Sequence, residues 1–169
     1  TQSVKINGEK VTKRECYAKA LQLYPEDCRS WHLLGLSLDP KETFSVNGEK
    51  MTKKQCYVKA LKHGSRYSTY WKNLGFILGT EEKIEVNGSS VGKKECYIRA
   101  LENHSKDATT WDLLGNHLEK EETVTVNGKV FTKQQCFVRA LEIDPKPLYW
   151  YSLGTTLSPV NPSWIDRIF

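Results

Sequence analysis

An Asn-Gly pair recurs four times at an interval of 40 residues. The pairs are Asn7-Gly8, Asn47-Gly48, Asn87-Gly88 and Asn127-Gly128. The surrounding residues repeat with them, as in Phe44 to Leu61, FSVNGEKMTKKQCYVKAL. Such a period is typical of repeat proteins, in which one repeat cannot bury its apolar face alone and stacks on its neighbours. The sequence therefore predicts a repeat array over residues 1–157, with repeats of about 1–40, 41–80, 81–120 and 121–157.

Each repeat begins with a predicted β-hairpin. Asn-Gly is the pair best suited to a type I′ turn, which needs positive φ at both central residues. Pairing across the first turn places Val4, Ile6 and Val11 on one face and the intervening lysines on the other. Because an isolated two-stranded hairpin is only marginally stable in water, we expect this apolar face to pack on another element.

A helix is predicted directly after each hairpin, and we call it the Cys helix. In repeats one, two and four a capping box opens it, at 12–15, 52–55 and 132–135, whereas Gly92 is a weaker cap in repeat three. An apolar stripe at helical spacing follows. Its members are Cys16, Tyr17, Ala20 and Leu21; Cys56, Tyr57, Ala60 and Leu61; Cys96, Tyr97, Ala100 and Leu101; and Cys136, Phe137, Ala140 and Leu141.

A second helix closes each repeat, and we call it the Trp helix. The first is predicted from about Asp27 to Leu38, between Pro25 and Pro40, because Pro cannot continue a helix. Four residues recur in these helices: Trp31, Leu34, Gly35 and Leu38; Trp71, Leu74, Gly75 and Leu78; Trp111, Leu114, Gly115 and Leu118; and Trp150, Leu153, Gly154 and Leu157. A glycine inside a helix costs about 1 kcal/mol relative to Ala. Its recurrence predicts that another helix approaches closely there.

The Trp-x2-Leu-Gly-x2 motif, with Tyr17-x2-Ala20 before Pro25 and Phe137-x2-Ala140 before Pro145, resembles the tetratricopeptide repeat family. The resemblance implies a mostly α protein with small β-hairpins: an α-solenoid of about four helix pairs, each with a two-stranded hairpin inserted between its helices. It also implies a non-enzymatic scaffold that binds a protein or peptide partner along its concave face.

The repeats depart from the family pattern at three points. Leu replaces the Tyr of the first helix, at Leu38, Leu78, Leu118 and Leu157. Lys stands at the small-residue position of the second helix, at Lys13, Lys53, Lys93 and Lys133. The period exceeds the family's 34 residues, and the excess falls at the hairpin. The first two departures alter helix packing, so we expect a different pitch.

Composition indicates a folded, reduced protein. Hydrophobic residues make up 38% and charged residues 27%, with a net charge of +5. No apolar run approaches the ~20 residues of a membrane span. One cysteine per repeat on an expected buried face favours packing over a disulfide or redox role and suits a cytoplasmic location. No signal peptide is visible, although this carries little weight because Thr1 is not a Met.

Catalytic and cofactor motifs are not found. The sequence has no H-E-x-x-H, Gly-rich phosphate loop or G-x-S-x-G motif, and its four histidines share no repeat position. We therefore expect no enzymatic activity, cofactor or metal.

Two surfaces could bind a partner. The resemblance implies a groove lined by the Trp helices, with candidates Arg29, His32, Leu33 and Leu36; Thr69, Lys72, Asn73 and Phe76; Thr109, Asp112, Leu113 and Asn116; and Leu148, Tyr151, Ser152 and Thr155. The alternative is a basic ridge at the start of the Cys helices: Lys13, Arg14, Lys53, Lys54, Lys93, Lys94 and Lys133. Cations there oppose the helix dipole, so the ridge could bind RNA, acidic tails or another anion. A solvated face that keeps the array soluble is the simpler reading, because no aromatic residues interleave for base stacking.

The segment 158–169 departs from the repeat. Two prolines interrupt it, and Trp164, Ile165, Ile168 and Phe169 end it. We expect it to cap the last repeat, since terminal repeats need a lid. The alternative is self-association, with the tail docking on another chain.

Overall fold

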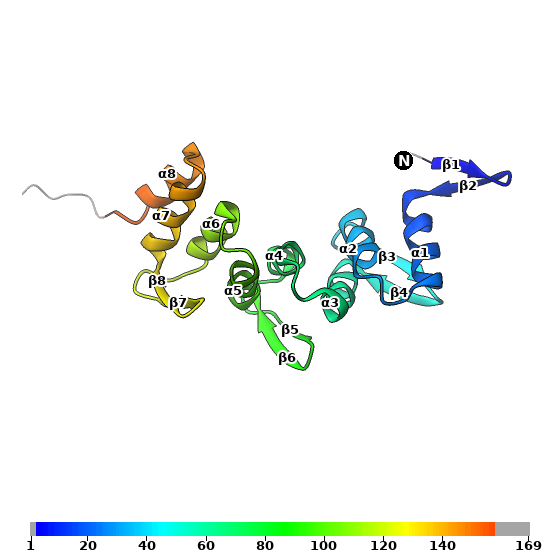
Figure 1. Cartoon of the computed structure of the whole chain (residues 1–169), viewed down its shortest axis with the longest axis horizontal. Coiled ribbons are helices and arrows are strands. Elements are labelled where there is room, and N and C mark those ends of the chain that lie inside the picture. Colours follow the sequence, from blue (N-terminus) through cyan, green and yellow to red (C-terminus); the bar gives the residue numbers. More distant parts are fainter. Residues whose placement is uncertain (1–2, 158–169) are drawn as a thin grey trace, which may run out of the picture. The chain divides into compact units, whose positions relative to one another are not determined.

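The computed structural model describes residues 3–157, and the predicted capping tail at 158–169 lies outside them. This part of the chain is mostly helical, with eight helices and four two-stranded antiparallel hairpins, as predicted. It divides into two compact units that are described separately, with the boundary between Ser105 and Lys106 (Figure 1).

Both units repeat the same order of elements. The first contains β1 (Ser3–Ile6), β2 (Glu9–Thr12), α1 (Lys13–Leu23), α2 (Cys28–Ser37), β3 (Thr43–Val46), β4 (Glu49–Thr52), α3 (Lys53–Gly64), α4 (Ser68–Ile77), β5 (Lys83–Val86), β6 (Ser89–Gly92) and α5 (Lys93–Asn103). The second contains α6 (Ala108–Asn116), β7 (Thr123–Val126), β8 (Lys129–Thr132), α7 (Lys133–Ile143) and α8 (Pro147–Gly154). The Cys helices are thus α1, α3, α5 and α7, and the Trp helices are α2, α4, α6 and α8. Among the described residues, none of these helices is both long and apolar enough to cross a bilayer.

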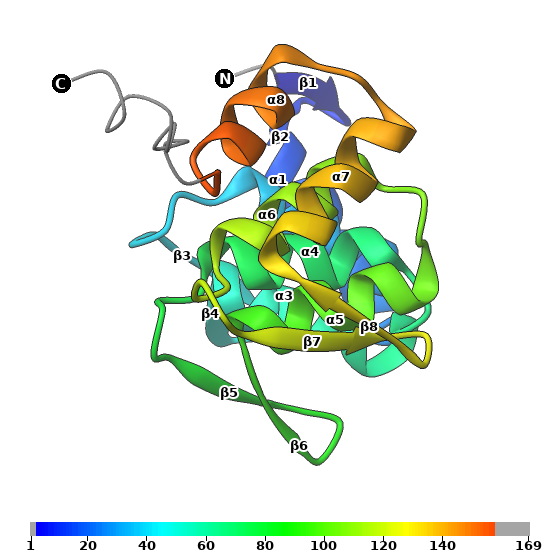
Figure 2. The same cartoon turned by 90° about the vertical axis from the view of Figure 1, so that its left-hand side faces the viewer.

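The hairpins have the predicted turns and register. Asn7 has φ 51° and Gly8 has φ 87°, and the three other pairs adopt the same left-handed conformation. Val4 pairs with Val11 and Lys5 with Lys10. Each hairpin leads directly into its Cys helix, as the strands β5 and β6 and the helix α5 show in Figures 1 and 2. The turn therefore sets both the strand pairing and the start of the helix.

The capping boxes are confirmed. The Thr52 Oγ1 accepts from the Gln55 backbone N–H, and the Gln55 side chain accepts from the Thr52 backbone N–H at 2.8 Å. Thr12 and Thr132 open α1 and α7 in the same way. Gly92 provides no side-chain cap for α5, as its lack of a side chain predicts.

Close approach at the Trp-helix glycine is confirmed in three repeats, whereas no described atom lies within 4 Å of a Cβ added to Gly154. The Trp helix packs on the Cys helix that follows the inserted hairpin. A Cβ atom added to Gly35 would lie 2.7 Å from Cε1 of Tyr57, and one added to Gly75 would lie 2.9 Å from Cε1 of Tyr97. In the second unit, a Cβ on Gly115 would lie 2.7 Å from Cε1 of Phe137. An aromatic ring thus lies flush against the Trp-helix backbone in three repeats.

The cysteines follow the predicted buried position in three repeats out of four. Cys56, Cys96 and Cys136 are buried, and burial raises the pKa of each thiol to about 12. Cys16, which was expected to be buried, is exposed. In the described structure no Trp helix packs on α1 in the way that α2 packs on α3, so the stripe of α1 is partly open.

The glycine contact gives a first prediction. Gly35→Ala places a methyl group against the Tyr57 ring, and we expect the free energy of unfolding to fall by about 1–3 kcal/mol, despite the helix propensity gained. Gly79→Ala is the control, because a Cβ there would meet only the Glu82 side chain, at an ordinary contact distance of 3.5 Å. It should leave stability unchanged or raise it by up to about 1 kcal/mol. Urea unfolding followed by tryptophan fluorescence measures both, and equal effects would contradict the contact.

Candidate partner-binding surface

In the first unit, the predicted groove residues come from two successive Trp helices, α2 and α4. The Asn73 Nδ2 hydrogen-bonds the His32 Nε2 at 2.8 Å, which joins the two helices. The His32 ring also lies 4.3 Å, centroid to centroid, from the ring of Tyr70. We call this contact the polar junction.

Exposed apolar side chains flank the polar junction. Leu36 lies one turn beyond His32 and is 47% exposed, and Phe76 lies one turn beyond Asn73 and is 66% exposed. The other candidates of this unit vary in exposure: Arg29 and Thr69 are exposed, and Leu33 and Lys72 are half-buried. Two exposed apolar positions thus lie one turn beyond the partners of a part-buried hydrogen bond.

The second unit has an equivalent junction between α6 and α8. Asp112 is buried, and its Oδ2 accepts from Asn116 Nδ2 at 3.1 Å. Burial raises the pKa of the Asp112 carboxyl, while side-chain hydrogen bonds from Ser152 and Asn116 act in the opposite direction. The Asp112 Oδ1 has no hydrogen-bond partner among the described residues.

Other candidates of the second unit lie around this junction. The Thr109 hydroxyl lies 3.2 Å from the Tyr149 hydroxyl, within hydrogen-bonding distance. Tyr151 and Thr155 are exposed, and Leu113 is half-buried. The buried His32 and Asp112 hold neighbouring Trp helices together, so a partner would meet mainly the exposed positions around them.

The basic ridge contacts the ends of the Trp helices. Lys53 Nζ donates to the Leu38 carbonyl oxygen at 2.8 Å, and Lys133 Nζ donates to the Leu118 carbonyl oxygen at 2.9 Å. Lys93 makes a longer contact, 3.5 Å, with the Phe76 carbonyl oxygen. A helix C-terminus carries partial negative charge and unpaired carbonyls, which a cation stabilises.

Two further ridge cations face the following repeat. Arg14 donates to the Ser37 carbonyl oxygen and pairs with Glu42, and Lys54 pairs with Glu82, with Nζ 2.6 Å from Oε2. Hydrogen bonds donated to the Glu42 and Glu82 carboxylates hold their pKa below the ordinary value. The Arg14 side chain is the largest cause for Glu42, and for Glu82 it is the Gly79 backbone N–H, followed by Lys54. These cations therefore link successive repeats.

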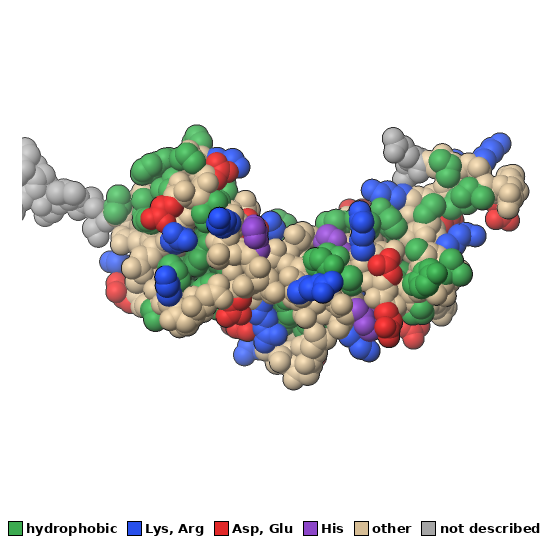
Figure 3. All heavy atoms as spheres, in the orientation of Figure 1, with side chains coloured by type: hydrophobic (Ala, Val, Ile, Leu, Met, Phe, Trp, Pro, Cys, Tyr) green, Lys and Arg blue, Asp and Glu red, His purple; other side chains and the backbone are tan. Residues whose placement is uncertain are grey.

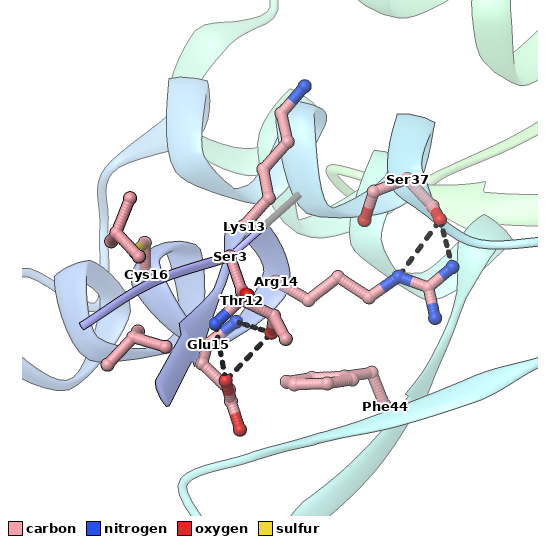
Figure 4. Close-up of a pocket in the computed structure, with 10 residues that line it drawn as sticks. Ser3, Thr12, Lys13, Arg14, Glu15, Cys16, Ser37 and Phe44 are labelled. Carbon is pink, nitrogen blue, oxygen red and sulfur yellow. Dashed lines mark hydrogen bonds between the residues drawn. The ribbon is translucent and has the colours of Figure 1, made fainter. Parts of the chain in front are cut away.

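A cleft of about 900 Å³ lies where hairpin β1–β2 and α1 meet the end of α2 and β3. Its lining includes Val4, Lys13, Cys16 and Phe44. Figure 4 shows Arg14 reaching the Ser37 carbonyl oxygen while Lys13 extends in another direction. The sequence analysis did not predict this cleft. The apolar face of the first hairpin, which needs another surface to pack on, was the feature that could have indicated it.

The described residues contain no group of three or more His, Cys, Asp or Glu side chains that could hold a metal ion. No known protein family or curated protein matches this chain. The described residues show repeated units of helices and hairpins, and the comparisons assign no family to them.

The polar junction gives a pH prediction. Burial lowers the pKa of His32 from 6.5 to about 4. Between these values the unfolded chain binds a proton that the folded chain does not, so stability present above pH 6.5 is lost as the pH falls toward 4. We expect His32 to contribute about 3 kcal/mol of this loss.

His32→Gln should remove that part of the pH dependence, because the Gln amide is neutral throughout. Urea unfolding at pH 7, 6, 5 and 4 measures it. The control is His104→Gln, at an exposed position, which should keep the wild-type slope. Asp112 contributes with the opposite sign, since its raised pKa favours the folded state at lower pH, but it is common to all three proteins. Identical slopes for His32→Gln and the wild type would refute the assignment.

Proposed function

We propose that this chain is a non-enzymatic scaffold resembling tetratricopeptide repeat proteins, which binds a segment of a partner protein across its Trp helices. The observation that supports it is the placement of Leu36 and Phe76. Both stand at the same repeat position on successive Trp helices, both are exposed, and the polar junction fixes their helices side by side.

The chemistry of this surface suggests the type of partner. Large apolar side chains that stay exposed on a rigid framework are suited to act as binding anchors. Because both helices are held by their Cys helices and by the junction, little ordering is needed when a partner binds, which favours affinity. The partner segment should therefore present apolar side chains to Leu36 and Phe76 and polar groups to Arg29 and Thr69.

The five cysteines suit a reducing compartment, and we propose that the chain acts in the cytoplasm. Nucleic acid is the less favoured partner. An anionic ligand is bound best by cations that have no partner within the protein. Lys53, Lys133 and Arg14 already donate hydrogen bonds to backbone carbonyls of this chain. Anion binding by the ridge is the alternative function.

The proposal is tested with a peptide array that identifies a binding segment, followed by titration with that peptide. We expect Phe76→Ser to weaken binding by roughly tenfold or more, as loss of an apolar anchor does. Val130→Thr is the matched control, because Val130 is similarly exposed but lies on β8. Equal affinity of the Phe76→Ser protein and the wild type would contradict the proposed surface.

Salt dependence separates the two alternatives. Binding through apolar anchors should change little between 50 and 200 mM salt, whereas binding through the ridge should weaken steeply and linearly in log[salt]. Lys10→Glu and Lys50→Glu, at exposed positions beside the ridge, should leave apolar binding unchanged and reduce ridge binding.

A further inference from the structure

Each internal contact between a Trp helix and a Cys helix joins two faces. One further copy of each of these faces is exposed among the described residues. One exposed face lies on α8 and the three residues after it. Their sequence keeps the pattern of α2, α4 and α6 as far as Leu157. Trp150 is 59% exposed, whereas Trp111 is 1% exposed. No described atom lies within 4 Å of a Cβ added to Gly154, although the three equivalent glycines are closely covered. We call Trp150, Leu153, Gly154 and Leu157 the Trp end.

The other uncovered face is on the first hairpin and α1. Ile6 is 53% exposed, whereas the equivalent Val46, Val86 and Val126 are buried. Cys16 is exposed and Tyr17 is half-buried, whereas Cys56 and Tyr57 are fully covered by α2. We call Ile6, Lys13, Cys16 and Tyr17 the open face. Figure 3 shows hydrophobic side chains at the surface over hairpin β1–β2 and α1, and also over α8.

We propose that the Trp end of one molecule docks on the open face of a second copy, in the geometry of the internal α2–α3 contact. The internal contacts supply the template. The Tyr17 ring would lie on the backbone at Gly154, as the Tyr57 ring lies on Gly35. Ile6 and Trp150 would both become buried, as their equivalents are inside the chain.

Charge complementarity supports the same pairing. Lys53 and Lys133 each donate to a carbonyl at the end of the preceding Trp helix, at Leu38 and Leu118. Among the described residues, Lys13 Nζ instead lies over the Tyr17 ring, 5.9 Å from its centroid. In the docked pair, Lys13 reaches the Leu157 carbonyl oxygen of the second copy, where it stabilises the α8 C-terminus.

A second cation would complete the contact around Trp150. Inside the chain, Lys59 lies over the Trp31 ring at 6.0 Å, and Arg99 lies over the Trp71 ring at 5.0 Å. Lys19 holds the equivalent position on α1. The two docking faces differ from each other, so each molecule can use both. Such a heterologous contact produces a closed ring or an open chain of copies.

Disulfide trapping between two different variants tests the contact. A Cβ on Gly35 would lie 3.1 Å from the Cβ of Cys56, so a cysteine at 154 and Cys16 of a second copy need only a small displacement to reach disulfide distance. One protein carries Gly154→Cys, Cys16→Ser and Cys28→Ser. The other carries only Cys28→Ser. Only a contact between molecules can join them through Cys16.

Under mild oxidation the mixture should yield a species of twice the 19.4 kDa monomer mass, with Cys16 linked to residue 154 by peptide mass spectrometry. The matched control replaces Gly154→Cys with Glu142→Cys, because the position of Glu142 is exposed in every repeat. This control should give only background linkage. Equal linkage in the two mixtures would overturn the proposal.

Light scattering of the untreated 169-residue chain gives the second measurement. We expect the mean mass to rise with concentration, and Gly154→Leu to weaken association by roughly tenfold or more because it blocks the Tyr17 site. Glu142→Leu adds the same side chain at an exposed position and should associate like the wild type. A mass that stays at 19.4 kDa, or equal association of the two variants, would contradict the proposed self-association. Another occupant would then cover these faces.

Discussion

The packing of successive repeats depends on the contact between an aromatic ring and a stretch of helix backbone that carries no side chain. Tyr57, Tyr97 and Phe137 lie against glycines of the Trp helices at distances that leave no room for a Cβ atom. The large ring compensates for the missing side chain, since it buries apolar area on both helices at once. The inserted hairpin must then span from one helix to the other without separating them, which a tight two-residue turn allows.

The lysines show how tertiary structure changes the meaning of a local signal. Within its own helix, a lysine in the first turn is unfavourable because it adds positive charge to the positive end of the dipole. Lys53 and Lys133 nevertheless extend to the negative end of the preceding Trp helix. The same charge thus joins two helices, and the recurrence that suggested an anion-binding ridge has a structural cause in these repeats.

Local features of the fold could be predicted from the sequence, because their causes act within a few residues. The Asn7-Gly8 turn and the Thr12 capping box are examples, and the glycine motif predicted a close helix contact by recurring. The polar junction could not be predicted: His32 and Asn73 come from different repeats, and the equivalent pair, Asp112 and Ser152, has different chemistry. The exposure of Cys16 was missed because a repeat pattern specifies which face is apolar and leaves open what covers it.

The buried cysteines have a consequence for the dynamics of the array. Cys56, Cys96 and Cys136 occupy one place in successive repeats and are buried. Cys56 and Cys96 lie against the glycine of the preceding Trp helix, and α7, which carries Cys136, packs on the preceding Trp helix in the same way. A thiol-reactive reagent can modify each of these three cysteines only when its Cys helix separates from the Trp helix packed on it. The three cysteines lie far enough apart in the sequence to be followed in separate proteolytic peptides. Their relative labelling rates would therefore report, repeat by repeat, how often each helix pair opens in the native protein.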